Sequence, residues 1–141
     1  MQLDRATRIL SLVVIVTSPG EDKAKYPLYD VTAEIIDLKE SEQLGPISSL
    51  GEFRSRRRTV TLGNLSPEFV RSAPDWNLGS GDTHRYAIDF FTRSGVFRQR
   101  LTLRVADGKW AVASQVLRGG VVIRESIPDH FPRDEHGQVQ W

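Results

Sequence analysis

A run of arginines in the middle of the chain carries the densest positive charge of the sequence: Arg54, Arg56, Arg57 and Arg58, interrupted only by Ser55. Guanidinium groups bind phosphate and carboxylate oxygens because each group offers paired N–H donors in a fixed plane. The run is therefore a candidate contact for a nucleotide, a nucleic acid or an acidic partner. The alternative is a solvated loop that leads into an edge strand, where charge also discourages edge-to-edge pairing.

A second set of arginines, Arg98, Arg100 and Arg104, occupies alternate positions of one predicted strand, so the three side chains share one face. The predicted pairing places Asp89 opposite Arg100 and Phe91 opposite Arg98. A sheet face that mixes arginines with an aromatic side chain can dock a protein or a nucleic-acid strand. Recognition of single strands usually needs two or three exposed aromatics, and here only Phe91 is so placed. The alternative is the ordinary solvated face of an antiparallel sheet.

The C-terminal segment 129–136 holds two histidines and three carboxylates, which are side chains that bind divalent metals. His130 and His136 are six residues apart with a proline between them, a spacing that matches no common metal site. We therefore expect no metal and no other cofactor. We expect Phe131 and Trp141 to pack this irregular tail onto the domain.

No catalytic motif is evident along the chain. The glycine-containing segment 78–82 lacks the helix that follows a phosphate-binding loop, and no nucleophile elbow is present. Asp75 and Asp82 flank Trp76, and paired carboxylates beside an aromatic occur in sugar hydrolases, but the sequence does not fix their separation. We therefore expect a non-catalytic protein, with a hydrolase-type activity as the remaining alternative.

Composition narrows the choice further. The formal net charge is only +1 over 141 residues, so the chain as a whole has no general attraction for nucleic acid or acidic membranes. Cysteine is absent, which excludes disulfides, thiolate metal sites and a cysteine nucleophile. The length suits a single domain, and the 39% of hydrophobic residues suffices for a folded core.

The apolar run Ile9–Thr17 is too short to cross a bilayer as a helix, for which about 20 apolar residues are needed. Its many β-branched residues favour a strand. We expect a central strand that is buried on both faces, and the alternative is the remnant of a targeting segment.

Turn signals between His84 and Ser126 predict a four-stranded antiparallel meander. Such two-residue loops favour the primed turns, whose twist matches that of the flanking strands. The three signals are Ser94-Gly95, Asp107-Gly108 and Gly119-Gly120. They predict the closing pairs Arg93 with Val96, Ala106 with Lys109, and Arg118 with Val121.

This pairing collects the apolar side chains of the meander on one face, because a slip of one residue would exchange the two faces. The predicted core face consists of Tyr86, Ile88, Phe90, Phe97, Leu101, Leu103, Val105, Trp110, Val112, Val116 and Ile123. The arginines and Phe91 then lie on the opposite face. Gln99, Ser114 and Glu125 are the polar residues expected on the core side.

The whole chain, 1–141, is predicted to be a single all-β domain of about seven strands. We expect an immunoglobulin-like antiparallel sandwich. The meander would form most of one sheet, and the strands around Leu12, Val31 and Val60 most of the other. The alternative is a small up-and-down barrel. Residues 39–58 are expected to form an irregular connector and residues 128–141 an irregular tail.

These observations lead us to expect a soluble interaction domain, a module of a larger protein or assembly, that docks a protein partner through an exposed sheet face. The residues expected to make that contact are Phe91, Arg98, Arg100 and Arg104. The alternative is a domain that binds a small molecule, a nucleotide or a nucleic acid through its arginine clusters, including Arg54, Arg56, Arg57 and Arg58. No membrane-spanning segment is expected.

Overall fold

The computed structural model describes residues 28–66, 78 and 81–141, together with the backbone of five two-residue strands. These short strands are β1 (Leu3–Asp4), β2 (Ile9–Leu10), β3 (Val13–Val14), β6 (Arg71–Ser72) and β7 (Trp76–Asn77). The longer strands are β4 (Leu28–Asp37), β5 (Arg57–Leu65), β8 (Thr83–Thr92), β9 (Gly95–Ala106), β10 (Lys109–Arg118) and β11 (Val121–Ser126). The helices are α1 (Leu38–Leu44) and α2 (Leu50–Ser55).

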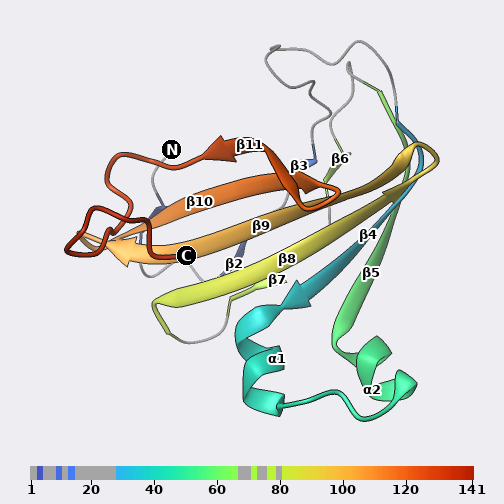
Figure 1. Cartoon of the computed structure of the whole chain (residues 1–141), viewed down its shortest axis with the longest axis horizontal. Helices are drawn as coiled ribbons and strands as arrows, with labels where there is room; N and C mark the ends of the chain where they lie inside the picture. Colours follow the sequence, from blue (N-terminus) through green and yellow to red (C-terminus); the bar gives the residue numbers. More distant parts are fainter. Residues whose placement is uncertain are drawn as a thin grey trace.

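One open antiparallel sheet dominates the molecule, with the strand order β1-β10-β9-β8-β4-β5 and with β11 also paired to β10 (Figure 1). The all-β prediction is confirmed. Strand β4 pairs with β8 over Thr32–Asp37, so β4 and β5 lie in the same sheet as the meander. The assignment of the strands around Val31 and Val60 to a second sheet was therefore wrong, and an immunoglobulin-like sandwich is not confirmed.

The predicted register holds at the middle hairpin and changes at the first. Ala106 pairs with Lys109 as predicted, across a turn in which Asp107 and Gly108 both have positive φ. The β8–β9 hairpin closes at Thr92 and Gly95 instead of Arg93 and Val96. The Thr92 hydroxyl donates to the Gly95 carbonyl and accepts from the Ser94 amide, which stabilises the turn one residue earlier. The slip amounts to two residues, so every side chain keeps its predicted face.

A bulge changes the third hairpin. Arg118 pairs with Val121 as predicted, but Ile123 is an extra residue in β11 and Val116 pairs with Arg124. The predicted pairing of Val116 with Ile123 was therefore wrong. A bulge adds one unpaired residue and bends its strand, which shifts the pairing of all residues beyond it.

The main core lies on the predicted face of the sheet. Its buried members are Val31, Ala33, Ile35, Leu62, Leu65, Leu78, Tyr86, Ile88, Leu101, Leu103 and Trp110, packed against the half-buried Phe90 and Val105. Val112 and Ile123 were predicted to be core residues, but both are exposed. Val112 lies near the edge of the sheet on β10, and Ile123 lies in the bulge of the edge strand β11.

The predicted central strand over Ile9–Thr17 lies partly outside the described residues. Its described parts, β2 and β3, belong to two separate two-stranded sheets with β7 and β6. The centre of the main sheet is formed instead by β9 and β8. The prediction of a central strand was therefore wrong for the described parts, because β2 and β3 pair with β7 and β6 and not with any strand of the main sheet.

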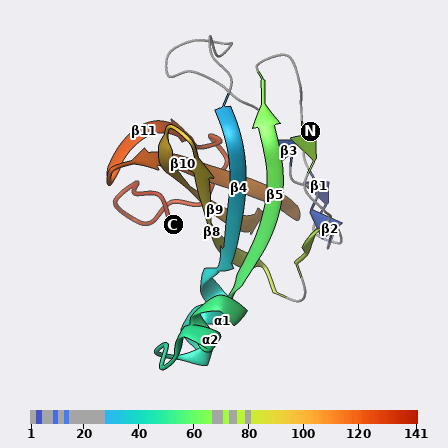
Figure 2. The same cartoon turned by 90° about the vertical axis from the view of Figure 1, so that its right-hand side faces the viewer.

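Residues 39–58 were expected to be irregular, but they contain all but the first residue of α1, the whole of α2 and the start of β5. Each helix has an N-cap: Asp37 accepts from the Glu40 amide and Ser49 accepts from the Glu52 amide. Neither helix buries a residue. The two helices project together beyond the ends of β4 and β5 (Figures 1 and 2).

The C-terminal tail, residues 128–141, contains one isolated bridge between Arg133 and Val139 and no strand or helix. It packs on the sheet face opposite the main core, on the other side from the small sheets (Figure 2). Phe131 is 2% exposed and forms a second hydrophobic cluster with Ala111 and Ala113. Trp141 is partly buried and packs against this cluster. The expected packing of Phe131 and Trp141 onto the domain is confirmed.

Candidate docking surface on the outer sheet face

The sheet face opposite the main core, called the outer face below, carries a row of charged residues on three neighbouring strands. Glu34 of β4 lies opposite Asp89 of β8, which lies opposite Arg98 of β9. Two carboxylates directly opposite each other repel. Arg57 of β5 offsets this repulsion, because its Nη1 lies 2.8 Å from Glu34 Oε2 and 3.5 Å from Asp89 Oδ2.

Asp89 and Arg98 form the tightest pair of this row. Arg98 Nε donates to Asp89 Oδ1 at 2.6 Å and its Nη2 donates to Oδ2 at 2.9 Å, a bidentate arrangement. The side chain of Asp89 is only 8% exposed. The hydrogen bonds from Arg98 hold the pKa of the Asp89 carboxyl below its ordinary value of 3.8, against the opposing effect of burial. The same contact raises the pKa of Arg98.

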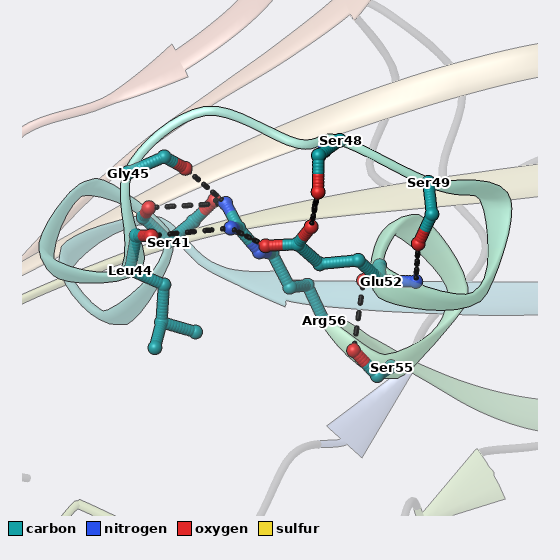
Figure 3. Close-up of polar contacts among 8 residues, drawn as sticks. All are labelled: Ser41, Leu44, Gly45, Ser48, Ser49, Glu52, Ser55 and Arg56. Atoms are coloured by element: carbon teal, nitrogen blue, oxygen red, sulfur yellow. Dashed lines mark hydrogen bonds and ion pairs between the residues drawn. The ribbon is translucent and has the colours of Figure 1, made fainter.

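The segment formed by α1, α2 and the turn between them is called the helical hairpin below. Arg56 lies inside it and is not a surface cation (Figure 3). Its side chain is 5% exposed. Nη1 donates to the carbonyl oxygens of Ser41 and Gly45 at 3.2 and 2.6 Å, and Nη2 donates to the Leu44 carbonyl at 3.5 Å. These are the carbonyls at the end of α1 that have no helical partner. Arg56 therefore caps α1 from the far end of α2.

Glu52 completes this polar centre. Its Oε1 accepts from Arg56 Nη2 at 2.7 Å, and its Oε2 accepts from the amide and the hydroxyl of Ser48 at 3.0 and 2.6 Å. The hydrogen bonds from Ser48, followed by that from Arg56, lower the pKa of Glu52 from 4.5 to about 2. The carboxylate is thus ionised at all ordinary pH values and fixes the loop that precedes α2.

The predicted arginine run is therefore divided between different environments. Arg56 lies within the helical hairpin, and Arg57 is paired with the carboxylates of the outer face and stacks on the Phe53 ring at 4.2 Å. Arg58 pairs with Ile35, on the core side of β5. Arg54 is exposed and makes no ion pair with another described residue. The four arginines do not converge on one surface.

The arginines of β9 also differ from one another. The predicted partner of Asp89 was Arg100, but the register makes it Arg98. Arg104 donates to the carbonyl oxygens of Gln140 and Trp141 at 2.7 and 3.4 Å and so holds the tail. Arg100 remains exposed and makes no ion pair with another described residue.

The uncovered end of the outer face is apolar. Phe91 lies opposite Val96, and Val122 lies opposite Leu117, which in turn lies opposite Arg98. Phe91, Val96 and Val122 are 37%, 49% and 45% exposed. We call these three residues the end patch. Phe91 and Val96 lie next to the turn of the β8–β9 hairpin, and Val122 lies next to the turn of the β10–β11 hairpin.

Both hairpin turns at this end are tied together. Arg118 Nη2 donates to the Ser94 carbonyl at 3.5 Å, and the Arg118 guanidinium lies 5.1 Å from the centre of the Phe97 ring. At the first hairpin, the Arg93 amide donates to the Tyr29 carbonyl and its guanidinium pairs with Asp30. The strands that carry the end patch are therefore held in position by these contacts between the turns and the neighbouring strands.

The sequence indicated Phe91 as a contact residue but not Val96. The available signal was the alternation of Val96 with Phe97, which places Val96 outside once Phe97 faces the core. The exposed hydrophobic residues of the helical hairpin were also missed, because residues 39–58 were expected to be irregular.

Among the described residues, no helix has the length and apolar character needed to span a membrane. Comparison with known protein families finds no match to the chain. Comparisons with curated proteins and with solved structures likewise find no match.

Proposed function

We propose that this protein is a non-catalytic interaction domain that docks a protein partner through the end patch of the outer face. The observation that carries the proposal is the gathering of Phe91, Val96 and Val122 on one face from three strands, each more than a third exposed. Exposed apolar side chains that gather on one surface are typical of interaction sites.

The remainder of the outer face supports this choice of site. The tail covers the region around Ala111 and Ala113, and Arg85 is held by Glu42 of α1 at 2.5 Å. Arg98 is engaged by Asp89 beside the patch. An aromatic and two valines next to a fixed arginine match the composition of interface centres, which are apolar and rich in aromatic residues and arginine.

Binding of a polyanion gains no comparable support. Arg56, Arg57, Arg98 and Arg104 donate to partners within the chain. A phosphate would have to displace those partners before it could use the same N–H groups. Of the seven arginines predicted to bind, Arg54 and Arg100 are exposed and make no ion pair with a described residue, and they lie on different elements.

Photocrosslinking in the native cell tests the proposal. A photoreactive amino acid placed at Val96 is expected to give a discrete adduct, which Phe91→Asp should abolish. Val112→Asp is the matched control, because Val112 is also 37% exposed but lies on the opposite face. Loss of the adduct in both variants, or in neither, would refute docking through the end patch.

A further inference from the structure

The turn between the two helices exposes large aliphatic side chains. Leu44, Ile47 and Leu50 are 58%, 48% and 63% exposed. The segment 43–51, called the helical tip below, contains these three residues and no charged residue. It lies at the far end of the helical projection, away from the end patch (Figures 1 and 2).

The helices that carry these side chains are not held in place by packing against the hydrophobic core. Neither α1 nor α2 buries a residue. Short helices without a buried face are marginal by themselves, so other contacts must hold them. Arg56, Glu52 and the two N-caps supply those contacts (Figure 3). Hydrogen bonds and an ion pair within the helical hairpin thus hold the apolar tip in a fixed conformation.

The same bonds satisfy several polar groups of the helical tip. The carbonyls of Leu44 and Gly45 accept from Arg56, and the amide and hydroxyl of Ser48 donate to Glu52. Ser49 accepts the Glu52 amide, while Arg56 neutralises the Glu52 charge. Transfer of a polar group out of water is costly only when it lacks a hydrogen bond. The tip therefore leaves water at a reduced cost.

We propose that the helical tip inserts into the interfacial region of a lipid bilayer. A convex, charge-free tip with three aliphatic side chains needs no matching groove, because a bilayer adapts to its shape. The charge beside the tip favours an anionic surface, because Arg54 is exposed there and makes no ion pair with another described residue, whereas the charge of Glu52 is neutralised by Arg56. Arg54 can therefore contact lipid phosphate.

Co-sedimentation of the full chain with phosphatidylcholine vesicles, with and without phosphatidylglycerol, tests the proposal. Binding is expected to both, and more strongly to the anionic vesicles. The double variant Ile47→Ser, Leu50→Ser should weaken partitioning at least about tenfold, because each buried aliphatic side chain contributes strongly to transfer from water. Arg54→Gln should reduce binding about fivefold, and only to anionic vesicles.

The double variant Val121→Ser, Ile123→Ser is the matched control. Those two side chains are 64% and 36% exposed and do not belong to the end patch, and they lie on β11, away from the helical tip. Vesicle binding should be unchanged in this control. The proposal would be overturned if the wild-type chain bound neither kind of vesicle. It would also be overturned if both double variants lost vesicle binding to the same extent. The competing occupant of the tip is then a groove on a protein.

Discussion

Replacement of Asp89 by asparagine tests whether the charged row of the outer face stabilises the fold. The asparagine side chain has the same size, so packing is retained and only the charge is lost. It cannot serve as a double acceptor for Arg98, and its amide group would face the donors of Arg98 and Arg57. We expect the free energy of unfolding to fall at neutral pH.

The size of the loss follows from the contacts. Two hydrogen bonds from Arg98 to a carboxylate that is 8% exposed would each contribute up to about 3 kcal/mol if fully buried. The Arg98 side chain is 43% exposed, so water recovers much of its solvation when the carboxylate is removed. The net destabilisation should be about 2 kcal/mol. A double-mutant cycle with Arg98→Met should show a coupling energy of about 1 kcal/mol or more.

The effect should also depend on pH in a defined direction. The folded-state pKa of Asp89 lies below its ordinary value of 3.8. Its stabilising contribution is therefore complete above the unfolded-state pKa and is lost as pH falls through the folded-state pKa. The difference between the wild type and Asp89→Asn should be constant near neutrality and should shrink below about pH 4.

Urea denaturation followed by circular dichroism at several pH values measures these differences. Asp129→Asn is the control, because Asp129 is exposed and an exposed change of this kind should alter stability by less than about 0.5 kcal/mol. A loss below that value for Asp89→Asn, or a coupling energy near zero, would refute a stabilising role for the row.

Three further predictions concern the helical hairpin and the tail. Arg56→Ala should speed amide hydrogen exchange in α1 and α2 about thirtyfold, because several hydrogen bonds are lost there. Exchange in the main sheet should be nearly unchanged. Equal acceleration in the helices and in the sheet would contradict this prediction. The pKa of Glu52 is about 2, below its ordinary value, so its contribution to the stability of the helical hairpin should be lost only as pH falls through about 2. In an NMR titration the Ser48 amide resonance should therefore keep its position down to pH 3. Phe131→Ala should lower the free energy of unfolding by about 3 kcal/mol and speed tryptic cleavage after Arg133, and an unchanged cleavage rate would show that the tail is held without Phe131.

The meander was predictable because local turn chemistry fixed most of its register. Asp107 and Gly108 both adopt the positive φ that a primed turn needs, and the pairing on either side follows. The slip at Thr92 depends on a hydroxyl hydrogen bond, and nearby Arg93 contacts Tyr29 and Asp30, which are distant in the sequence. The contacts of Arg93 leave no local signal in the sequence, whereas the Thr92 hydroxyl bonds are local but compete with an equally plausible turn one residue later.

The roles of the arginines were predictable only in part. Alternation placed Arg98, Arg100 and Arg104 on one face, but it did not show which of them had partners. Arg98 meets Asp89 because of the two-residue slip, and Arg104 meets the tail carbonyls across 36 residues or more. Charge clusters in a sequence therefore indicated where cations gather but not which of them remain exposed.

A comparison of two neighbouring probe positions on β11 tests the proposed docking face most directly. Val122 lies on the outer face opposite Leu117, whereas Val121, opposite Arg118, points to the other face of the same strand. Photoreactive residues placed at these two positions should give a partner adduct from position 122 and little or none from position 121. Equal adducts from both positions, or an adduct from position 121 alone, would contradict docking through the outer face.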